Sequence, residues 1–243
     1  MKFDNVISLG GNCNIALNLK ELGFRKASYP FDWLVSYDVE KVVFLIENDF
    51  KGFLNYQNLQ QYSNNRCCYY DVENDLHFYH DFDQYLSLRV QLPKVREKYR
   101  RRIRRFYMDI TKPTLFVRYI LIEDDLKNTA KKCKEIDDFL KSFNSKNQIL
   151  YCSHIRGCEK ILDSCYYSPK DENSWLTTKP ILKNENFKNY LLALENPDKY
   201  YNLEFAKREE KQIIELSTFE IIQKKIRKKL SRPYIHNKLY IDE

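Results

Sequence analysis

The chain has 243 residues, 15% of them aromatic, and a net charge of +7. That length supports one large domain with a sizeable core. No apolar run reaches about eighteen residues, which excludes a transmembrane helix, and the first residues carry no secretory signal. Seven cysteines, an odd number, fit reduced thiols better than a disulfide framework, so we expect a cytoplasmic protein.

The basic residues are concentrated in two runs, 98–105 and 224–229. Each run is either a solvated helix face or a surface that attracts phosphates, anionic lipids or anionic sugars. Because the net basic excess is modest, we expect no nucleic-acid partner. The abundance of Lys, Asn, Ile and Tyr is typical of an AT-rich bacterial genome.

Residues 5–9 form a short apolar run that predicts a buried strand. Gly10 and Gly11 predict a tight turn after it, and Asn12 is a good N-cap for a helix. The helix is indicated by a period of three to four residues in its apolar positions, and Gly23 is a natural stop. Those apolar positions are Ile15, Leu19 and Leu22.

The next part of the chain predicts an aromatic turn over residues 28–36 and a helix over 37–50. Residues 51–76 are polar and rich in Tyr and Asn, which indicates an irregular excursion. A short strand or a loop is expected over 76–82. Pro93 is then expected to begin another helix.

Strand, helix and strand follow one another between residues 114 and 152, with the strands over 114–120 and 148–152. This spacing predicts a βαβ unit with parallel strands. Ligands of such sheets bind at the carboxyl ends of the strands, where we expect Cys13, Arg118 and His154. The helix face between the strands consists of Leu126, Ala130, Cys133, Ile136, Leu140 and Phe143.

The C-terminal part of the chain carries weaker patterns. A polar loop is expected over 168–180 and a short helix over 184–194. We expect one α/β domain over residues 1–205 that carries the active site. Residues 206–243 are expected to form a basic helix and an extended tail, which could contact an anionic membrane.

Cys13 lies in the first turn of the first predicted helix. A helix N-terminus favours the thiolate, which is the reactive form of cysteine, so Cys13 is a candidate nucleophile that would be alkylated rapidly at mildly acidic pH. Backbone N–H groups near Gly10 and Gly11, and the Asn12 side chain, could stabilise an oxyanion. The alternative is that Cys13 is a small buried residue where strand meets helix.

The stretch SLGGNCNIALNLKELGFRKASYPFDWLVS resembles the opening signature of DUF1796, a bacterial family described as papain-like cysteine peptidases. The matching positions are Ser8, Leu9, Gly10, Asn12, Cys13, Ala16, Gly23, Arg25, Pro30, Phe31, Asp32 and Trp33. Weaker similarity is found in the blocks at 80–82, 102–106 and 116–118, so the resemblance covers roughly residues 5–155.

The resemblance implies a cysteine nucleophile with a histidine base. His80 follows the papain-like order along the chain and lies in one of the similar blocks, while His154 is the rival at the edge of the predicted sheet. Asp81, Asp83 or Asp32 could orient the imidazole.

On the substrate side we place Gly10, Gly11, Trp33 and Arg118. Arg118 lies inside an apolar strand, where an unpaired charge is costly, so it either pairs with a buried carboxylate such as Asp32 or contacts an anionic ligand.

No cofactor or metal is expected. The spacing of Cys152, His154, Cys158 and Cys165 matches no compact zinc site, and neither glycine-rich phosphate-loop pattern is present. The acidic run 123–125 either caps a helix or holds a divalent metal.

The expected fold class is α/β: three layers with a mostly parallel, doubly wound-like sheet, flanking helices and a C-terminal helical extension. A papain-like α+β fold is the alternative.

The first functional hypothesis is a cysteine-dependent hydrolase or acyl-group transferase that acts on a peptide, glycan or other small substrate, with a link to surface-polysaccharide biosynthesis. The second is a glycosyltransferase-like or sugar-phosphate-binding enzyme that uses Arg118, the basic run and residues 123–125. The third is a non-catalytic binding protein.

Overall fold

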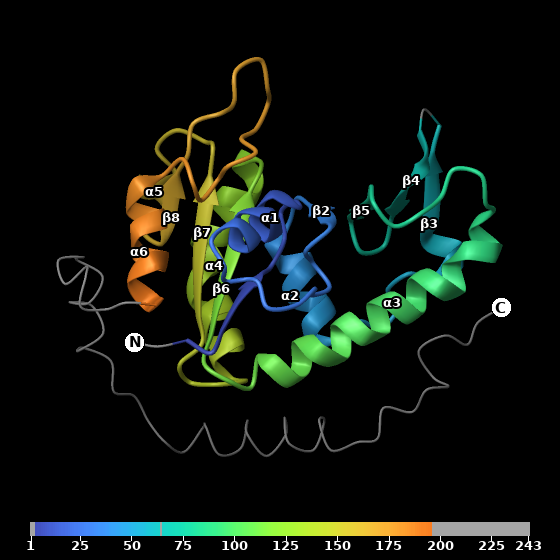
Figure 1. The fold of residues 1–243 in the computed structure, drawn as a ribbon, viewed down its shortest axis with the longest axis horizontal. Coiled ribbons are helices and arrows are strands. Elements are labelled where there is room, and N and C mark those ends of the chain that lie inside the picture. The colour runs from blue at the N-terminus through green and yellow to red at the C-terminus, as the bar shows by residue number, and fades with distance from the viewer. Residues whose placement is uncertain (1–2, 64, 196–243) are drawn as a thin grey trace.

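The computed structural model describes residues 3–63 and 65–195, which form two four-stranded sheets with flanking helices (Figure 1). The parallel sheet has the order β1-β6-β7-β8 and the antiparallel sheet the order β2-β5-β4-β3. The strands are β1 (Asn5–Ser8), β2 (Leu34–Ser36), β3 (Leu59–Tyr62), β4 (Asn65–Asp71), β5 (Leu76–Phe78), β6 (Thr114–Ile120), β7 (Gln148–Ser153) and β8 (Cys165–Tyr167).

The helices are α1 (Asn14–Glu21), α2 (Val39–Glu47), α3 (Leu88–Asp109), α4 (Glu123–Lys141), α5 (Cys158–Ile161) and α6 (Glu185–Glu195), with a single 3₁₀ turn over Tyr56–Asn58. The predicted α/β class and the βαβ unit are confirmed, because β6 and β7 pair in parallel around α4. Within the described residues, no helix is both long and apolar enough to cross a membrane.

The parallel sheet is buried on both faces, and every residue of β6 is buried. Since side chains alternate across a strand, β6 serves two separate clusters. Leu115, Val117 and Tyr119 belong to the cluster that includes residues of α1 and α6. Phe116 and Ile120 belong to the larger cluster that includes residues of α2, α3 and α4.

The antiparallel sheet corrects the prediction that residues 51–76 are irregular, because β3 and β4 lie in that segment. The pattern is weak because the strands are short and β3 is mostly solvated, with Gln60 and Gln61 both exposed. In the neighbouring strands, Tyr69 and Phe78 belong to the large core cluster.

Helix α3 begins at Leu88, five residues before the expected start at Pro93, which lies inside the helix. Ser87 precedes the helix with an extended backbone. Proline near the start of a helix interrupts few backbone bonds, so α3 continues through it.

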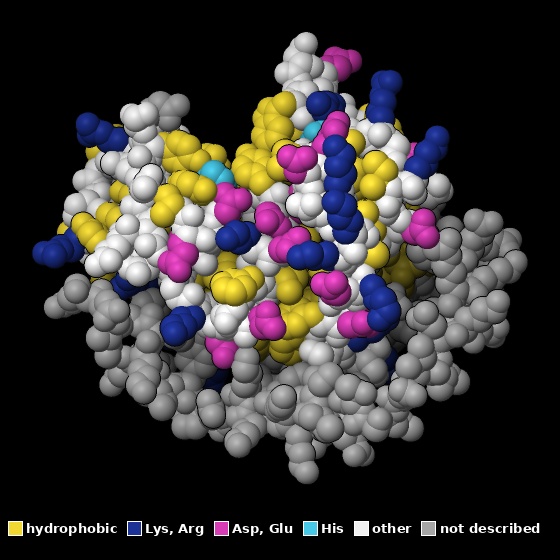
Figure 2. Space-filling view, turned by 180° about the vertical axis from the view of Figure 1, so that it is seen from behind, with side chains coloured by type: hydrophobic (Ala, Val, Ile, Leu, Met, Phe, Trp, Pro, Cys, Tyr) yellow, Lys and Arg dark blue, Asp and Glu magenta, His cyan; other side chains and the backbone are white. Residues whose placement is uncertain are grey.

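The basic run 98–105 lies on α3 and is engaged locally. Lys98 pairs with Asp81, and Arg105 donates to the carbonyl of Ser28 at 2.7 Å. Figure 2 shows basic and acidic side chains interspersed on the face in view. These contacts favour the interpretation as a helix face. The second run, 224–229, and the expected domain boundary at 205 lie outside the described residues.

Arg118 is fully buried in β6 and holds four chain segments together. Its guanidinium donates to the carbonyl of Leu9 at 3.1 Å, to the hydroxyl of Ser36 at 3.0 Å and to the carboxylate of Asp125 at 3.0 Å. The expected buried carboxylate is therefore present, but it is Asp125 in α4 and not Asp32. Both side chains of this ion pair are 0% exposed.

Asp125 uses its second carboxylate oxygen to begin another helix. Its Oδ1 accepts from the N–H of Val39, the first residue of α2, at 2.9 Å and from the hydroxyl of Thr129 at 3.3 Å. A buried charge is tolerated only when its hydrogen-bonding capacity is used in this way. The pair therefore fixes α2 and α4 against the parallel sheet.

We predict that Asp125→Asn lowers the free energy of unfolding by about 3–5 kcal/mol, because it leaves the Arg118 charge buried without a counter-charge. Asp138→Asn is the matched control. Asp138 pairs with Lys134 on the exposed face of α4, where an ion pair contributes about 0.5 kcal/mol or less. Urea denaturation of both variants measures the difference, and equal costs would contradict the structural role of the buried pair.

A second prediction concerns Gly11, whose φ is +89° and whose added Cβ would lie 1.9 Å from the backbone oxygen of Tyr119. We expect Gly11→Ala to destabilise the fold by at least about 3 kcal/mol. Gly23 has a similar φ of +84° with nothing within 4 Å, so Gly23→Ala should cost only about 1–2 kcal/mol. Similar losses in urea denaturation would show that the backbone conformation, and not the close approach to Tyr119, is what matters.

Candidate active site

Cys13 occupies the N-cap position of α1, beside the carboxyl end of β1, and is partly buried. Asn12, the expected N-cap, precedes that position by one residue, and its Oδ1 accepts from the N–H of Asn14 at 3.0 Å. The thiol of Cys13 lies 4.0 Å from Oδ1 of Asn14. Among the described residues, no imidazole is hydrogen-bonded to this thiol.

The structure corrects the prediction of a stabilised thiolate. Burial raises the pKa of the Cys13 thiol, and its own backbone amide opposes the rise only in part. Desolvation dominates the pKa shift because, in the described part of the chain, no cationic side chain contacts the sulfur. Cys13 is therefore a protonated thiol at neutral pH, and it needs a base before it can attack.

The amides of the Gly-Gly turn are already engaged. The N–H of Gly10 donates to the Ser8 hydroxyl at 3.1 Å, and the N–H of Gly11 donates to the Ser36 hydroxyl at 3.3 Å. Neither amide is free to bind a developing oxyanion in this state. The turn instead fixes the backbone that leads into Cys13, with the Cβ position of Gly10 3.3 Å from the carbonyl oxygen of Phe31.

His154 follows β7 and is buried against Tyr119 of β6. The Tyr119 hydroxyl lies 2.9 Å from Nδ1 of His154 and accepts from the backbone N–H of Thr177 at 3.1 Å. This hydroxyl has one proton and two lone pairs, so it either donates to Nδ1 or accepts from a protonated Nδ1. The pKa of His154 is lowered, first by burial and then by the nearby charge of Lys170.

A hydrogen-bonded chain joins His154 to the first turn of α1. Beyond Tyr119, the carbonyl of Thr177 accepts from the Asn14 side chain at 3.1 Å, and Asn14 is the residue next to Cys13. β1 and β7 lie on either side of β6, so their backbones are about 10 Å apart. The thiol and the imidazole therefore share a network without touching.

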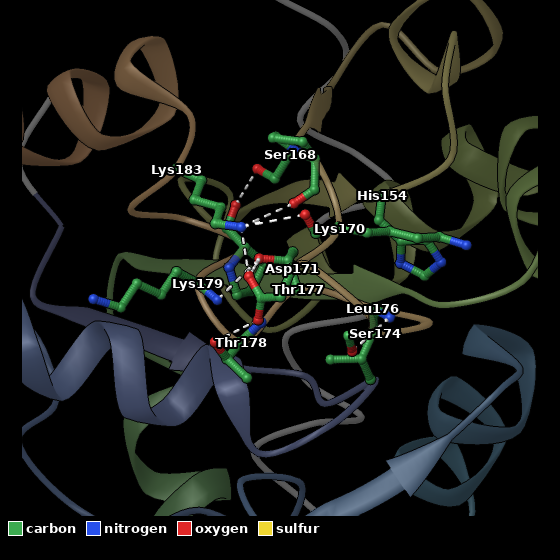
Figure 3. A network of polar contacts seen from close by, with 12 residues as sticks. His154, Ser168, Lys170, Asp171, Ser174, Leu176, Thr177, Thr178, Lys179 and Lys183 are labelled. Atoms are coloured by element: carbon green, nitrogen blue, oxygen red, sulfur yellow. Dashed lines mark hydrogen bonds and ion pairs between the residues drawn. The ribbon is translucent and has the colours of Figure 1, made fainter.

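The loop that carries Thr177 is held by Asp171 (Figure 3). The Asp171 carboxylate accepts from the hydroxyl of Thr177 at 3.2 Å and from the N–H of Thr178 at 2.7 Å, and it pairs with Lys183 at 2.5 Å. These bonds hold the pKa of Asp171 well below its usual range. The ionised carboxylate thus keeps the loop against the carboxyl edge of the parallel sheet.

His80, the first candidate for the base, follows β5 of the antiparallel sheet by two residues and is exposed. Its ring meets the Trp33 ring edge-on at 5.9 Å, and the Arg25 guanidinium lies 5.4 Å from the centre of Trp33. Trp33 is thus half-buried and is in contact with His80 and Arg25.

The acids proposed to orient His80 have other partners. Asp32 is buried and accepts from the Arg25 guanidinium at 2.8 Å and from the N–H of Tyr29 at 3.0 Å, so it orders the aromatic turn. Burial nevertheless raises the pKa of Asp32. Asp81 accepts from the Tyr99 hydroxyl at 2.8 Å, and Asp83 from the N–H of Tyr85 at 2.7 Å.

Two of the acidic residues considered for metal binding form ion pairs with basic side chains. Asp125 is buried with Arg118, while Glu123 at the surface pairs with Lys127 at 3.4 Å. Within the described ranges, no group of three or more acidic, His or Cys side chains is arranged to hold a metal ion. These two acids are thus engaged in ion pairs, and the N-cap residue Ile122 makes no side-chain cap bond at the start of α4.

Three residues of this network were not singled out from the sequence: Asn14, Tyr119 and Thr177. Tyr119 could have been found from the sequence, because it is the next-to-last residue of β6 and therefore lies close to the carboxyl end, where ligands were expected. Thr177 had none, since loop residues follow no period.

We predict that iodoacetamide modifies Cys13 more slowly than a free cysteine at pH 7, and that the rate rises only above the usual thiol range near pH 8.5. Cys13→Ser identifies the modified site by peptide mass. Rapid, selective modification near pH 6 would instead show that the helix terminus outweighs desolvation.

Comparisons with known proteins agree with the sequence signature. One relative, "Uncharacterized protein R408" of Acanthamoeba polyphaga mimivirus, is 30% identical over 172 residues, which cover 61% of this chain and 76% of that protein. No solved structure matches. The family model described as "Putative papain-like cysteine peptidase (DUF1796)" matches residues 4–152, and the chain therefore belongs to the DUF1796 family.

Proposed function

We propose that the protein is a cysteine-dependent acyl hydrolase or acyl transferase in which Cys13 is the nucleophile and His154 the acid–base residue. The observation that carries this proposal is the chain of hydrogen bonds from the first turn of α1 through Thr177 and Tyr119 to His154. The description of the DUF1796 family as peptidases supports the same chemistry.

Two features favour His154 over His80 as the base. His154 lies at the carboxyl edge of the sheet whose first strand leads into Cys13, and its lowered pKa keeps it neutral and able to accept a proton at pH 7. His80 is exposed and meets the Trp33 ring edge-on. Since the Cys13 thiol has a raised pKa, a neutral imidazole is the group that the chemistry requires.

In the proposed reaction the sulfur of Cys13 attacks the acyl carbon, and the neutral imidazole of His154 is the final acceptor of the thiol proton. The imidazolium then gives a proton to the leaving group as its bond to the acyl carbon breaks. Water or an acceptor hydroxyl attacks the thioester and gives its proton to His154. The bond between the sulfur and the acyl carbon then breaks, and the imidazolium returns the proton to the sulfur.

The setting of this chemistry is also part of the proposal. All seven cysteines are free thiols, which supports a reducing compartment such as the cytoplasm. Helices on both faces of the parallel sheet support the doubly wound-like, three-layer description of that half. The substrate is proposed only as an acyl compound, because no contact in the structure favours polysaccharide assembly.

The test uses p-nitrophenyl acetate, a small activated ester. We expect a burst of one nitrophenolate per chain and an acetyl group on Cys13, detected by peptide mass. His154→Gln should slow acylation by about 10²–10⁴-fold, the usual contribution of a general base. Tyr119→Phe should slow it as well, because it removes the hydroxyl that holds Nδ1 of His154.

His80→Gln is the matched control, since it changes the same side chain at an exposed position, and it should leave the burst unchanged. Loss of the burst in His80→Gln with normal acylation in His154→Gln would transfer the role of base to His80. Acetylation of another cysteine at an equal rate would contradict the assignment of Cys13.

A further inference from the structure

A cavity of about 690 Å³ opens at the carboxyl ends of β6, β7 and β8. This is the edge at which parallel sheets bind ligands, and the volume falls within the range of small-molecule sites. Its apolar wall includes Ile122, Ile155 and Tyr167, which follow or end those three strands. Cys13 does not line this cavity, but His154, the proposed acid–base residue, does.

The charged groups of the cavity are mainly cationic. Arg156 and Lys170 line it, and among the described residues neither side chain forms an ion pair. Glu123 lines it too, but this carboxylate is shared with Lys127. The lining therefore has an excess of one positive charge, which suits a small anion and not a polyanion.

His154 is part of the same wall. Its Nδ1 lies 2.9 Å from the Tyr119 hydroxyl, and no hydrogen bond to Nε2 is found in the described part of the chain. The residue is 7% exposed, and Nε2 can donate to a ligand when it carries a proton. Lys170 is close enough to lower the pKa of the ring, and Figure 3 shows the two side chains beside each other.

We propose that this cavity binds a phosphate monoester, with the phosphate between Arg156, Lys170 and Nε2 of His154. The apolar part of the ligand lies against Ile155 and Tyr167. Two cations of this kind match the charge of a phosphate monoester at neutral pH, and a guanidinium and an ammonium are common phosphate ligands in proteins. The loop held by Asp171 keeps Lys170 in place.

The test measures binding of phenyl phosphate to the full chain by NMR, with the His154 imidazole as the reporter. We expect saturable binding and a rise in the pKa of His154, because the phosphate offsets the charge of Lys170. Arg156→Gln with Lys170→Gln should weaken binding by about tenfold for each cation removed. The double variant Lys112→Gln with Lys134→Gln removes the same charge at exposed sites and should bind normally.

Cys13→Ser should bind phenyl phosphate as the wild type does, so this result is independent of the proposed acyl chemistry. Two control ligands have the same ring as phenyl phosphate. Benzoate carries a carboxylate, and benzyl alcohol carries no charge. Benzoate binding as tight as phenyl phosphate would overturn the assignment to phosphate, and benzyl alcohol binding as tight would overturn anion recognition. Absence of saturable binding, or binding unaffected by loss of Arg156 and Lys170, would overturn the site itself.

Discussion

The buried ion pair between Arg118 and Asp125 is the interaction on which the rest of the structure depends. Through it, β6 is joined to the end of β1, to Ser36 at the end of β2 and to the first turns of α2 and α4. Ser36 in turn accepts from the N–H of Gly11, two residues before Cys13. The position of Cys13 thus follows from a charge that the chain must neutralise inside its core.

This arrangement explains why the two sheets meet near Cys13. Both Ser36 and Leu9 accept from one guanidinium, so the parallel and the antiparallel sheet share a partner at this point. Arg118 was considered as a substrate contact, but its side chain is 0% exposed and its role here is to hold these segments together. The cations that line a cavity at this edge of the sheet are Arg156 and Lys170, beyond the ends of β7 and β8.

Much of the parallel half could be predicted from the sequence because its signals are local. Residues 114–120 are apolar apart from Thr114 and Arg118, and the predicted strand bounds are those of β6. The Gly-Gly turn and the short helix after it are also as predicted, with Gly23 at φ +84° after the last turn. These features depend on residues near one another in the chain.

The remainder depends on contacts between distant segments. Asp125 already satisfied a local role at the start of a helix, so nothing marked it as the partner of Arg118. The antiparallel sheet was missed because strands such as β3 bury so little of their length. The raised pKa of Cys13 could not be foreseen, since desolvation is set by tertiary packing and not by position in a helix.

The central claim is that Cys13 and His154 belong to one hydrogen-bonded network. The most direct measurement is the ¹⁵N NMR spectrum of the histidine side chains before and after Cys13 is alkylated with iodoacetamide at alkaline pH. The account predicts that the His154 ring resonances shift while those of His80 stay in place. A shift at His80 with no change at His154 would contradict it.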